Sequence, residues 1–147
     1  MKIAVINGPN LNFLGIREPQ IYGNSSLHDL EEKIRNYSCE KQIEVQFFQS
    51  NSEGALIDYL QSCYYDQVAG IIINPGAYTH YSYALCDAIK SINIPTIEVH
   101  ISHIQNREEF RKHSVTAPSC IGVIEGFGME GYNIAIDAIL RYLKLEK

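Results

Sequence analysis

The sequence predicts an α/β protein in which five parallel strands form one doubly wound sheet between two layers of helices. Short apolar segments alternate with helical patterns along the chain, which is typical of a parallel sheet covered by helices. Several of these segments are unbroken runs of Ile and Val, as expected for strands buried on both faces. The 147 residues are a usual length for one domain, so we expect a single domain over residues 1–147.

The expected strands are residues 3–6, 43–48, 70–73, 96–99 and 121–124. The first helix is predicted after Ser26, which suits an N-cap with Asp29 three residues on, and its apolar face is formed by Leu27, Leu30, Ile34 and Tyr37. Further helices are expected at 53–63, 81–92 and 132–145, with a short one at 107–112. With right-handed crossovers, these elements make a flavodoxin-like, three-layer fold.

Composition narrows the classes of function. The formal net charge of -5 argues against broad nucleic-acid binding, which needs a basic surface. No stretch approaches the ~20 apolar residues of a membrane span, and the N-terminus lacks the apolar region of a secretory signal, so we expect a cytoplasmic protein. The four cysteines form no CxxC pair and are expected to be buried thiols: Cys39, Cys63, Cys86 and Cys120.

Ligands of such sheets bind outside the carboxyl ends of the strands, so the loops at 8–25, 50–52, 74–80, 100–106 and 125–131 are where a site is expected. The first, which contains most of NGPNLNFLGIREPQIYG (7–23), is longer than the usual connection of about 2–6 residues. We predict a lid at about 8–25 that carries the polar residues Asn10, Asn12, Arg17 and Tyr22, although a structural loop could share this composition.

Two other loops carry polar groups. In NPGAYTH, the backbone amides at a helix start could bind an anion, while Asn74 and His80 could hydrogen-bond hydroxyls. In EVHIS, Glu98 and His100 lie two residues apart and therefore on one face of a strand. A carboxylate stabilises an imidazolium and orients it, which suits a general acid, although a structural ion pair is the alternative.

Two motifs favour other functions at first sight. GFGMEG, at 126–131, satisfies GxGxxG, but a dinucleotide site needs a further strand with an acidic residue about 20 positions on, and the sequence ends at Lys147. His100, His103 and His113 with Glu98 supply common zinc ligands, but their spacing matches no strong metal signature. We therefore expect no dinucleotide and no metal.

Taken together, NGPNLN, GIREPQIYG, NPGAYTH, EVHIS and REEFRKHS resemble the motif set of type II 3-dehydroquinate dehydratases, in the same order from Asn7 to about Ser114. The resemblance implies a cofactor-free lyase that dehydrates 3-dehydroquinate to 3-dehydroshikimate by anti elimination through an enolate, the third step of the shikimate pathway. It also implies a flavodoxin-like subunit within a homododecamer, a tetramer of trimers. Most lysines lie in predicted helices or at the termini, so no agent for imine chemistry is obvious.

The resemblance assigns catalytic roles. Tyr22 is the base that removes the C2 proton, Arg17 is its cationic neighbour, and Asn10 helps to position a water near the enolate. His100 protonates the departing hydroxyl, with Glu98 in support. A guanidinium near a tyrosine favours the phenolate, which is otherwise scarce at neutral pH because an ordinary tyrosine has a pKa of about 10.

The resemblance also assigns substrate-binding roles and shows two departures. It implies that the substrate hydroxyls are bound by Asn74, His80 and Arg111. It implies that the substrate carboxylate is bound by Ile101 and Ser102, and that Asp87 reaches a neighbouring subunit's site. Phe13 stands where an aliphatic residue is usual and His103 where Asn is common, which puts lid closure and local pKa values in question. The alternatives are a flavodoxin-like binding or signalling module and a different cofactor-free lyase acting on a related hydroxy acid.

Overall fold

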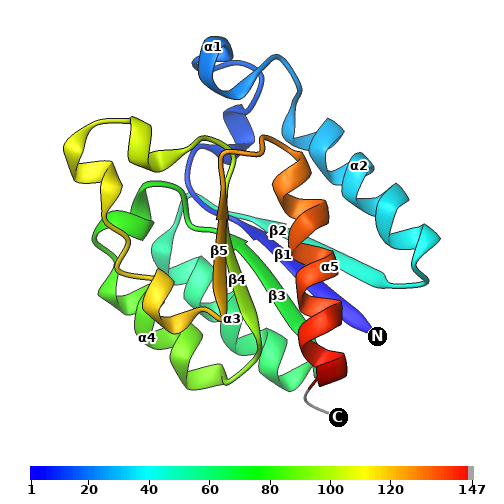
Figure 1. Ribbon diagram of the computed structural model, residues 1–147. Helices are drawn as coiled ribbons and strands as arrows, with labels where there is room; N and C mark the ends of the chain where they lie inside the picture. The colour runs from blue at the N-terminus through cyan, green and yellow to red at the C-terminus, as the bar shows by residue number, and fades with distance from the viewer. Residues whose placement is uncertain (146–147) are drawn as a thin grey trace.

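The predicted fold class is confirmed by a computed structural model that describes residues 1–145, except for the side chains of Tyr22 and Leu145. Five parallel strands form one sheet in the order β2-β1-β3-β4-β5 (Figure 1). Their bounds are β1 Lys2–Asn7, β2 Glu44–Gln49, β3 Gly70–Asn74, β4 Thr96–His100 and β5 Gly122–Glu125. Each strand end lies within one residue of the predicted end.

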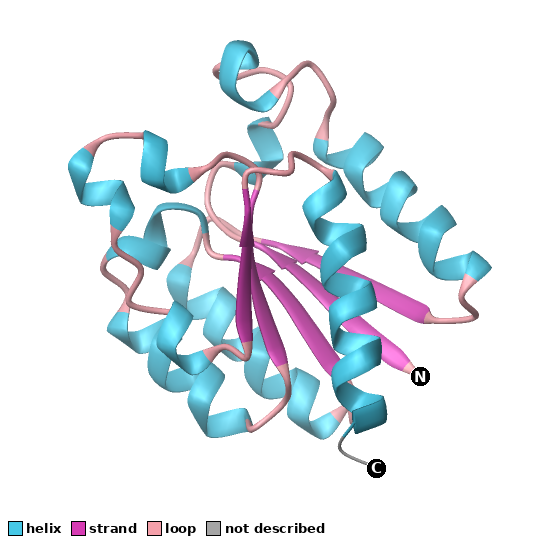
Figure 2. Cartoon of the chain, viewed as in Figure 1, coloured by secondary structure: helices cyan, strands magenta, loops and turns pink. Residues whose placement is uncertain are grey.

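Helices cover both faces of the sheet (Figure 2). Strand residues alternate between the faces, so Ile3 and Val5 pack in one apolar cluster while Ala4 and Ile6 pack in the other. The first cluster is completed by α2 (Leu27–Glu40) and α5 (Glu130–Leu145), and the second by α3 (Glu53–Tyr65) and α4 (Tyr83–Ile92). The central strands β1, β3 and β4 are almost wholly buried, whereas the edge strands β2 and β5 are partly exposed.

Local signals set the helix starts. The Ser26 hydroxyl accepts from the Asp29 amide at 3.1 Å and the Asp29 carboxylate accepts from the Ser26 amide at 2.8 Å, so α2 begins with the predicted capping box. The helix α4 begins at Tyr83, two residues later than predicted, because the Ser82 hydroxyl accepts from the Leu85 amide and acts as N-cap. None of the helices in the described chain has the length and apolarity needed to cross a bilayer.

The prediction that all four cysteines are buried is wrong. Only Cys63 is buried; Cys86 and Cys120 are partly exposed, and Cys39 is exposed. On α2, the buried face runs through Leu30, Ile34 and Ser38, and the next residue along a helix is turned about 100° away. Cys39 therefore points off the apolar face.

Candidate active site

One pocket lies at the carboxyl ends of the central strands, where the sequence predicted a site. It is formed by the loops that follow β1, β3 and β4, together with the segment after them that contains the 3-10 helices η3 (Ile104–Asn106) and η4 (Glu109–Lys112). The residues that line it are Pro9, Asn10, Leu11, Leu14, Arg17, Asn74, Gly76, Ala77, His80, His100, Ser102, Ile104, Arg107 and Arg111. Seven of the predicted site residues are therefore brought together.

Two glycines allow the loops after β1 and β3 to touch. A Cβ on Gly8 would lie 2.5 Å from the carbonyl oxygen of Pro75, and one on Gly76, whose φ is +59°, would lie 3.0 Å from that of Pro9. The Gly8 amide donates to the Asn74 carbonyl at 2.7 Å. This close contact places Asn10 and Asn74 in the same pocket.

The long loop after β1 contains two short helices, η1 (Leu11–Phe13) and α1 (Pro19–Tyr22), and rises beside α2 (Figure 1). Leu11 and Leu14 anchor its first half in the core, whereas Phe13 and Ile16 are exposed. The Arg17 guanidinium lines the pocket and pairs with Glu18 at 3.1 Å. Tyr22 ends α1, and its side chain lies outside the described part of the structure.

The side chain of Asn74 is held in place by the buried Tyr132. The Tyr132 hydroxyl accepts from Asn74 Nδ2 at 3.0 Å and donates to Asn7 Oδ1 at 2.7 Å. Asn74 Oδ1 accepts from the Gly76 amide at 3.1 Å, so both ends of the amide are held. Sequence analysis did not identify Tyr132, which lies 58 residues from Asn74.

Replacing Tyr132 by phenylalanine is expected to destabilise the protein by about 1–3 kcal/mol, because buried groups of Asn7 and Asn74 lose their partner. The midpoint of urea unfolding should fall with an unchanged m-value. The exposed Tyr65 offers a matched control, since Tyr65→Phe should leave the midpoint within error. An unchanged midpoint for Tyr132→Phe would mean that the hydroxyl bridge contributes nothing.

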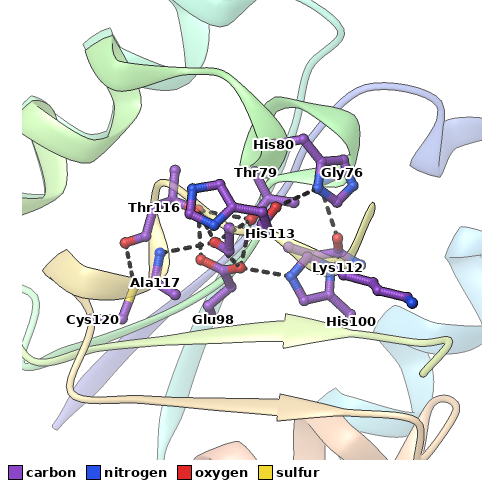
Figure 3. A network of polar contacts seen from close by, with 12 residues as sticks. Gly76, Thr79, His80, Glu98, His100, Lys112, His113, Thr116, Ala117 and Cys120 are labelled. Atoms are coloured by element: carbon purple, nitrogen blue, oxygen red, sulfur yellow. Dashed lines mark hydrogen bonds and ion pairs between the residues drawn. The ribbon is translucent and has the colours of Figure 1, made fainter. Parts of the chain in front are cut away.

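Glu98 and His100 form the predicted pair at the end of β4. Glu98 is fully buried, His100 is 5% exposed, and His100 Nε2 lies 2.7 Å from Glu98 Oε1. Burial raises the pKa of the Glu98 carboxyl, but His100 and the hydroxyls of Thr116 and Thr79 lower it by more, so its pKa lies below the ordinary value. Figure 3 shows these side chains converging on Glu98.

His80 and two arginines also line the pocket. The backbone carbonyl of His113 lies 2.8 Å from His80 Nδ1. Burial lowers the pKa of His80 despite that contact, and the nearby Arg111 guanidinium lowers it further. Arg111 pairs with Glu108 at 2.8 Å. Arg107 also lines the pocket; sequence analysis assigned it no role, although it lies four residues before Arg111.

The segment after β4 is shaped by the glycine-rich motif at 126–131. The Gly126 amide donates to the His100 carbonyl at 3.3 Å, and the Gly128 amide donates to the Ile101 carbonyl at 3.1 Å. The Ile101 side chain packs in the core, whereas Ser102 lines the pocket. The motif therefore supports the site through its backbone.

Other predicted residues lie elsewhere. Asp87 lines a separate cavity beside Lys90 and Pro118, outside the pocket of its own chain. His103 pairs with Glu125 at 2.7 Å, at the rim of the sheet. Among the described residues, no group of three His, Cys, Asp or Glu side chains is placed to hold a metal ion.

Known proteins match this chain over nearly its whole length. The family model described as dehydroquinase class II matches residues 1–140. A 3-dehydroquinate dehydratase of Clostridium acetobutylicum is 59% identical over 143 residues, which cover 97% of this chain and 99% of that protein. One from Caldicellulosiruptor bescii is 58% identical over 142 residues, covering 97% and 98%.

Solved structures agree with this match. The crystal structure of type II dehydroquinase from Butyrivibrio crossotus has a TM-score of 0.94 and 57% identity, over 95% of this chain and 97% of that one. The one from Propionibacterium acnes has a TM-score of 0.91 and 41% identity, over 94% of each chain. The resemblance seen in the sequence motifs is confirmed. The chain belongs to the class II dehydroquinase family of enzymes.

Proposed function

We propose that the protein dehydrates 3-dehydroquinate to 3-dehydroshikimate by anti elimination through an enolate. The observation that carries the proposal is the convergence of Asn10, Arg17, His80, His100 and Arg111 on one pocket at the strand ends. These groups bear the hydrogen-bonding and charge properties that a hydroxylated carboxylate and an enolate require. Family membership supports the same reaction.

The first step removes the C2 proton. In the proposal, the Tyr22 phenolate takes that proton, and the electron pair left on carbon moves onto the neighbouring carbonyl oxygen to give the enolate. Arg17 favours the phenolate by direct charge interaction. Closure of the lid at about 8–25 excludes water, which strengthens this interaction.

The second step expels the hydroxyl group. Asn10, through a bound water, donates to the enolate oxygen while the charge is there. The enolate then re-forms its carbonyl, the carbon–oxygen bond to the hydroxyl breaks, and His100 supplies the proton that lets the group leave as water. Because His100 is held by Glu98 at 2.7 Å, its other ring nitrogen is available to the pocket.

The remaining polar groups bind the substrate. Asn74, His80 and Arg111 are proposed to bind its hydroxyls. Ser102 and the backbone of Ile101 are proposed to bind its carboxylate; the Ile101 side chain is committed to the core. The proposed catalytic domain is the whole chain, 1–147.

The activity is tested by ultraviolet absorbance, because the conjugated enone product absorbs and the substrate barely does. Chelator-treated protein is added to 3-dehydroquinate, and the absorbance should rise at the same rate before and after borohydride treatment. A rise abolished by borohydride would indicate an imine mechanism. No rise from folded protein would turn attention to another hydroxy acid, for which a substrate panel is the measurement.

Replacing Arg17 by alanine is expected to raise the apparent pKa of the base in the pH profile of kcat/KM. Loss of the cation disfavours the phenolate, so activity near neutral pH falls and recovers as the pH rises. Arg35, which is exposed on α2 and pairs with Glu32, offers a control: Arg35→Ala should not move the profile. An unmoved profile for Arg17→Ala would remove the ion-pair role.

We propose further that the protein acts in the cytoplasm, at the third step of the shikimate pathway, as a homododecamer built from four trimers. Asp87 lies on α4, outside the pocket of its own chain, so the role that the resemblance gives it requires a neighbouring subunit. Sedimentation velocity tests this: a particle of about twelve chains is expected, and a monomer would contradict the role of Asp87.

A further inference from the structure

Three hydroxyl groups surround the buried Glu98 carboxylate. Thr79 Oγ1 and Ser114 Oγ donate to Glu98 Oε1 at 2.6 and 2.9 Å, and Thr116 Oγ1 donates to Oε2 at 2.5 Å. His100 Nε2 makes the fourth contact, at 2.7 Å to Oε1. Thr79, Ser114 and Thr116 are called the hydroxyl cage below.

All three cage hydroxyls and His100 can donate to Glu98 at once only if Glu98 is ionised. Each hydroxyl has one proton to donate, and an ionised carboxylate can accept about four hydrogen bonds. The three cage oxygens also lie 2.7 to 3.2 Å from one another, and Ser114 Oγ accepts from the Ala117 amide at 3.0 Å. A protonated Glu98 would need an acceptor for its own hydrogen, so a cage hydroxyl or His100 would have to give up its donation.

The cage also links the segments that build the pocket. Thr79 belongs to the 3-10 helix η2 (Gly76–His80), directly before His80. Ser114 and Thr116 lie between η4, which carries Arg111, and the 3-10 helix η5 (Ala117–Ser119). Among the described residues, His80, from η2, and Cys120, which directly follows η5, interact electrostatically with Glu98, in addition to its contact with His100.

We infer that Thr79, Ser114 and Thr116 are positioning residues that hold Glu98 as an anion, so that His100 keeps its Nε2 proton toward Glu98 and directs Nδ1 to the substrate. The inference rests on the proposed function for its kinetic consequence. With Glu98 fixed as an anion, a proton reaching His100 stays on the imidazole until the departing hydroxyl takes it. A protonated Glu98 would remove the charge that stabilises the imidazolium.

The test replaces Thr116 by valine, which keeps the shape and removes the hydroxyl, and by serine, which keeps the hydroxyl. A hydrogen bond to a charged group changes a protonation equilibrium by about tenfold or more, so Thr116→Val should move the acidic limb of the kcat profile to higher pH by about one unit. At mildly acidic pH, kcat should fall about tenfold and recover toward wild type at higher pH. KM should change little, because Thr116 does not line the pocket.

A second measurement does not depend on turnover. Infrared spectra as a function of pH detect the carbonyl band of a protonated carboxyl, and Glu98→Gln identifies which band belongs to Glu98. Thr116→Val should show this band at mildly acidic pH, where the wild type and Thr116→Ser do not. If Thr116→Val fails to fold, Ser114→Ala removes another donor, at a less buried position, and should give the same two changes.

Three outcomes would overturn the inference. One is a kcat profile and infrared spectrum of Thr116→Val that match the wild type. Another is a Thr116→Ser enzyme as altered as Thr116→Val, which would assign the effect to packing. The third is a wild-type Glu98 band at mildly acidic pH. Wild-type protein without turnover would contradict the proposed function instead. The infrared measurement would still test whether the hydroxyl cage keeps Glu98 ionised.

Discussion

Replacing Tyr22 by phenylalanine is expected to lower kcat by about 10²- to 10⁴-fold, because the substitution removes the only oxygen of the proposed base. The change leaves the ring in place, so the fold should be preserved. Substrate binding should also persist, since Asn74, His80, Ser102 and Arg111 remain. The effect is therefore predicted in kcat, with KM changed much less.

Two assays measure this loss. The first follows enone absorbance in Tyr22→Phe beside the matched control Tyr65→Phe, whose hydroxyl is exposed on α3 away from the pocket. The second follows exchange of the substrate's C2 proton with deuterium from the solvent by NMR. The rates of absorbance change and of exchange should both fall by this factor in Tyr22→Phe. Continued exchange would show that another group is the base.

Replacing His100 by asparagine is expected to lower kcat by a similar factor, about 10²- to 10⁴-fold, for a different reason. His100 is held at the pocket wall by its contact to Glu98, so it is placed to protonate the departing hydroxyl. Asparagine can hydrogen-bond but cannot carry a proton to the leaving group. The second step of the reaction should fail while the first remains possible.

The exchange assay separates the two steps. His100→Asn should still exchange the C2 proton, because Tyr22 and Arg17 are intact, while water loss becomes slow. His28 is exposed on α2 and does not line the pocket, so His28→Asn serves as the control with wild-type rates. Loss of exchange and elimination together in His100→Asn would contradict a role confined to the second step.

Sequence reasoning predicted most of the framework because its signals are local. The runs of Ile and Val at β1 and β3 report burial on both faces, and the capping box of Ser26 and Asp29 is complete within four residues. Where a signal was weaker, the prediction failed: α4 starts later than expected, and Cys39 lies one position beyond the buried face of α2.

The motifs identified the positions at the strand ends but did not assign all of their partners. Thr79 and Ser114 belong to the motifs NPGAYTH and REEFRKHS, yet no sequence pattern predicts their hydrogen bonds to Glu98, which is 19 and 16 residues away. The sequence likewise did not place Arg107 in the pocket, because its four-residue spacing from Arg111 indicates only that the two would share one side of a helix. Tyr132 is more distant still, 125 residues from Asn7, and its aromatic type predicts only burial.

The sequence by itself determined the family, the loops at the strand ends that carry polar residues, and the chemical types of the candidate catalytic groups. These follow from the hydrophobic pattern and from motifs that are contiguous in the chain. Only the tertiary structure decided which hydroxyls surround Glu98, how Asn74 is held by Tyr132, and that Asp87 lies outside the pocket of its own chain. The physical reason is that hydrogen bonds and burial depend on distances between segments, and those distances exist only once the sheet brings the strand ends together.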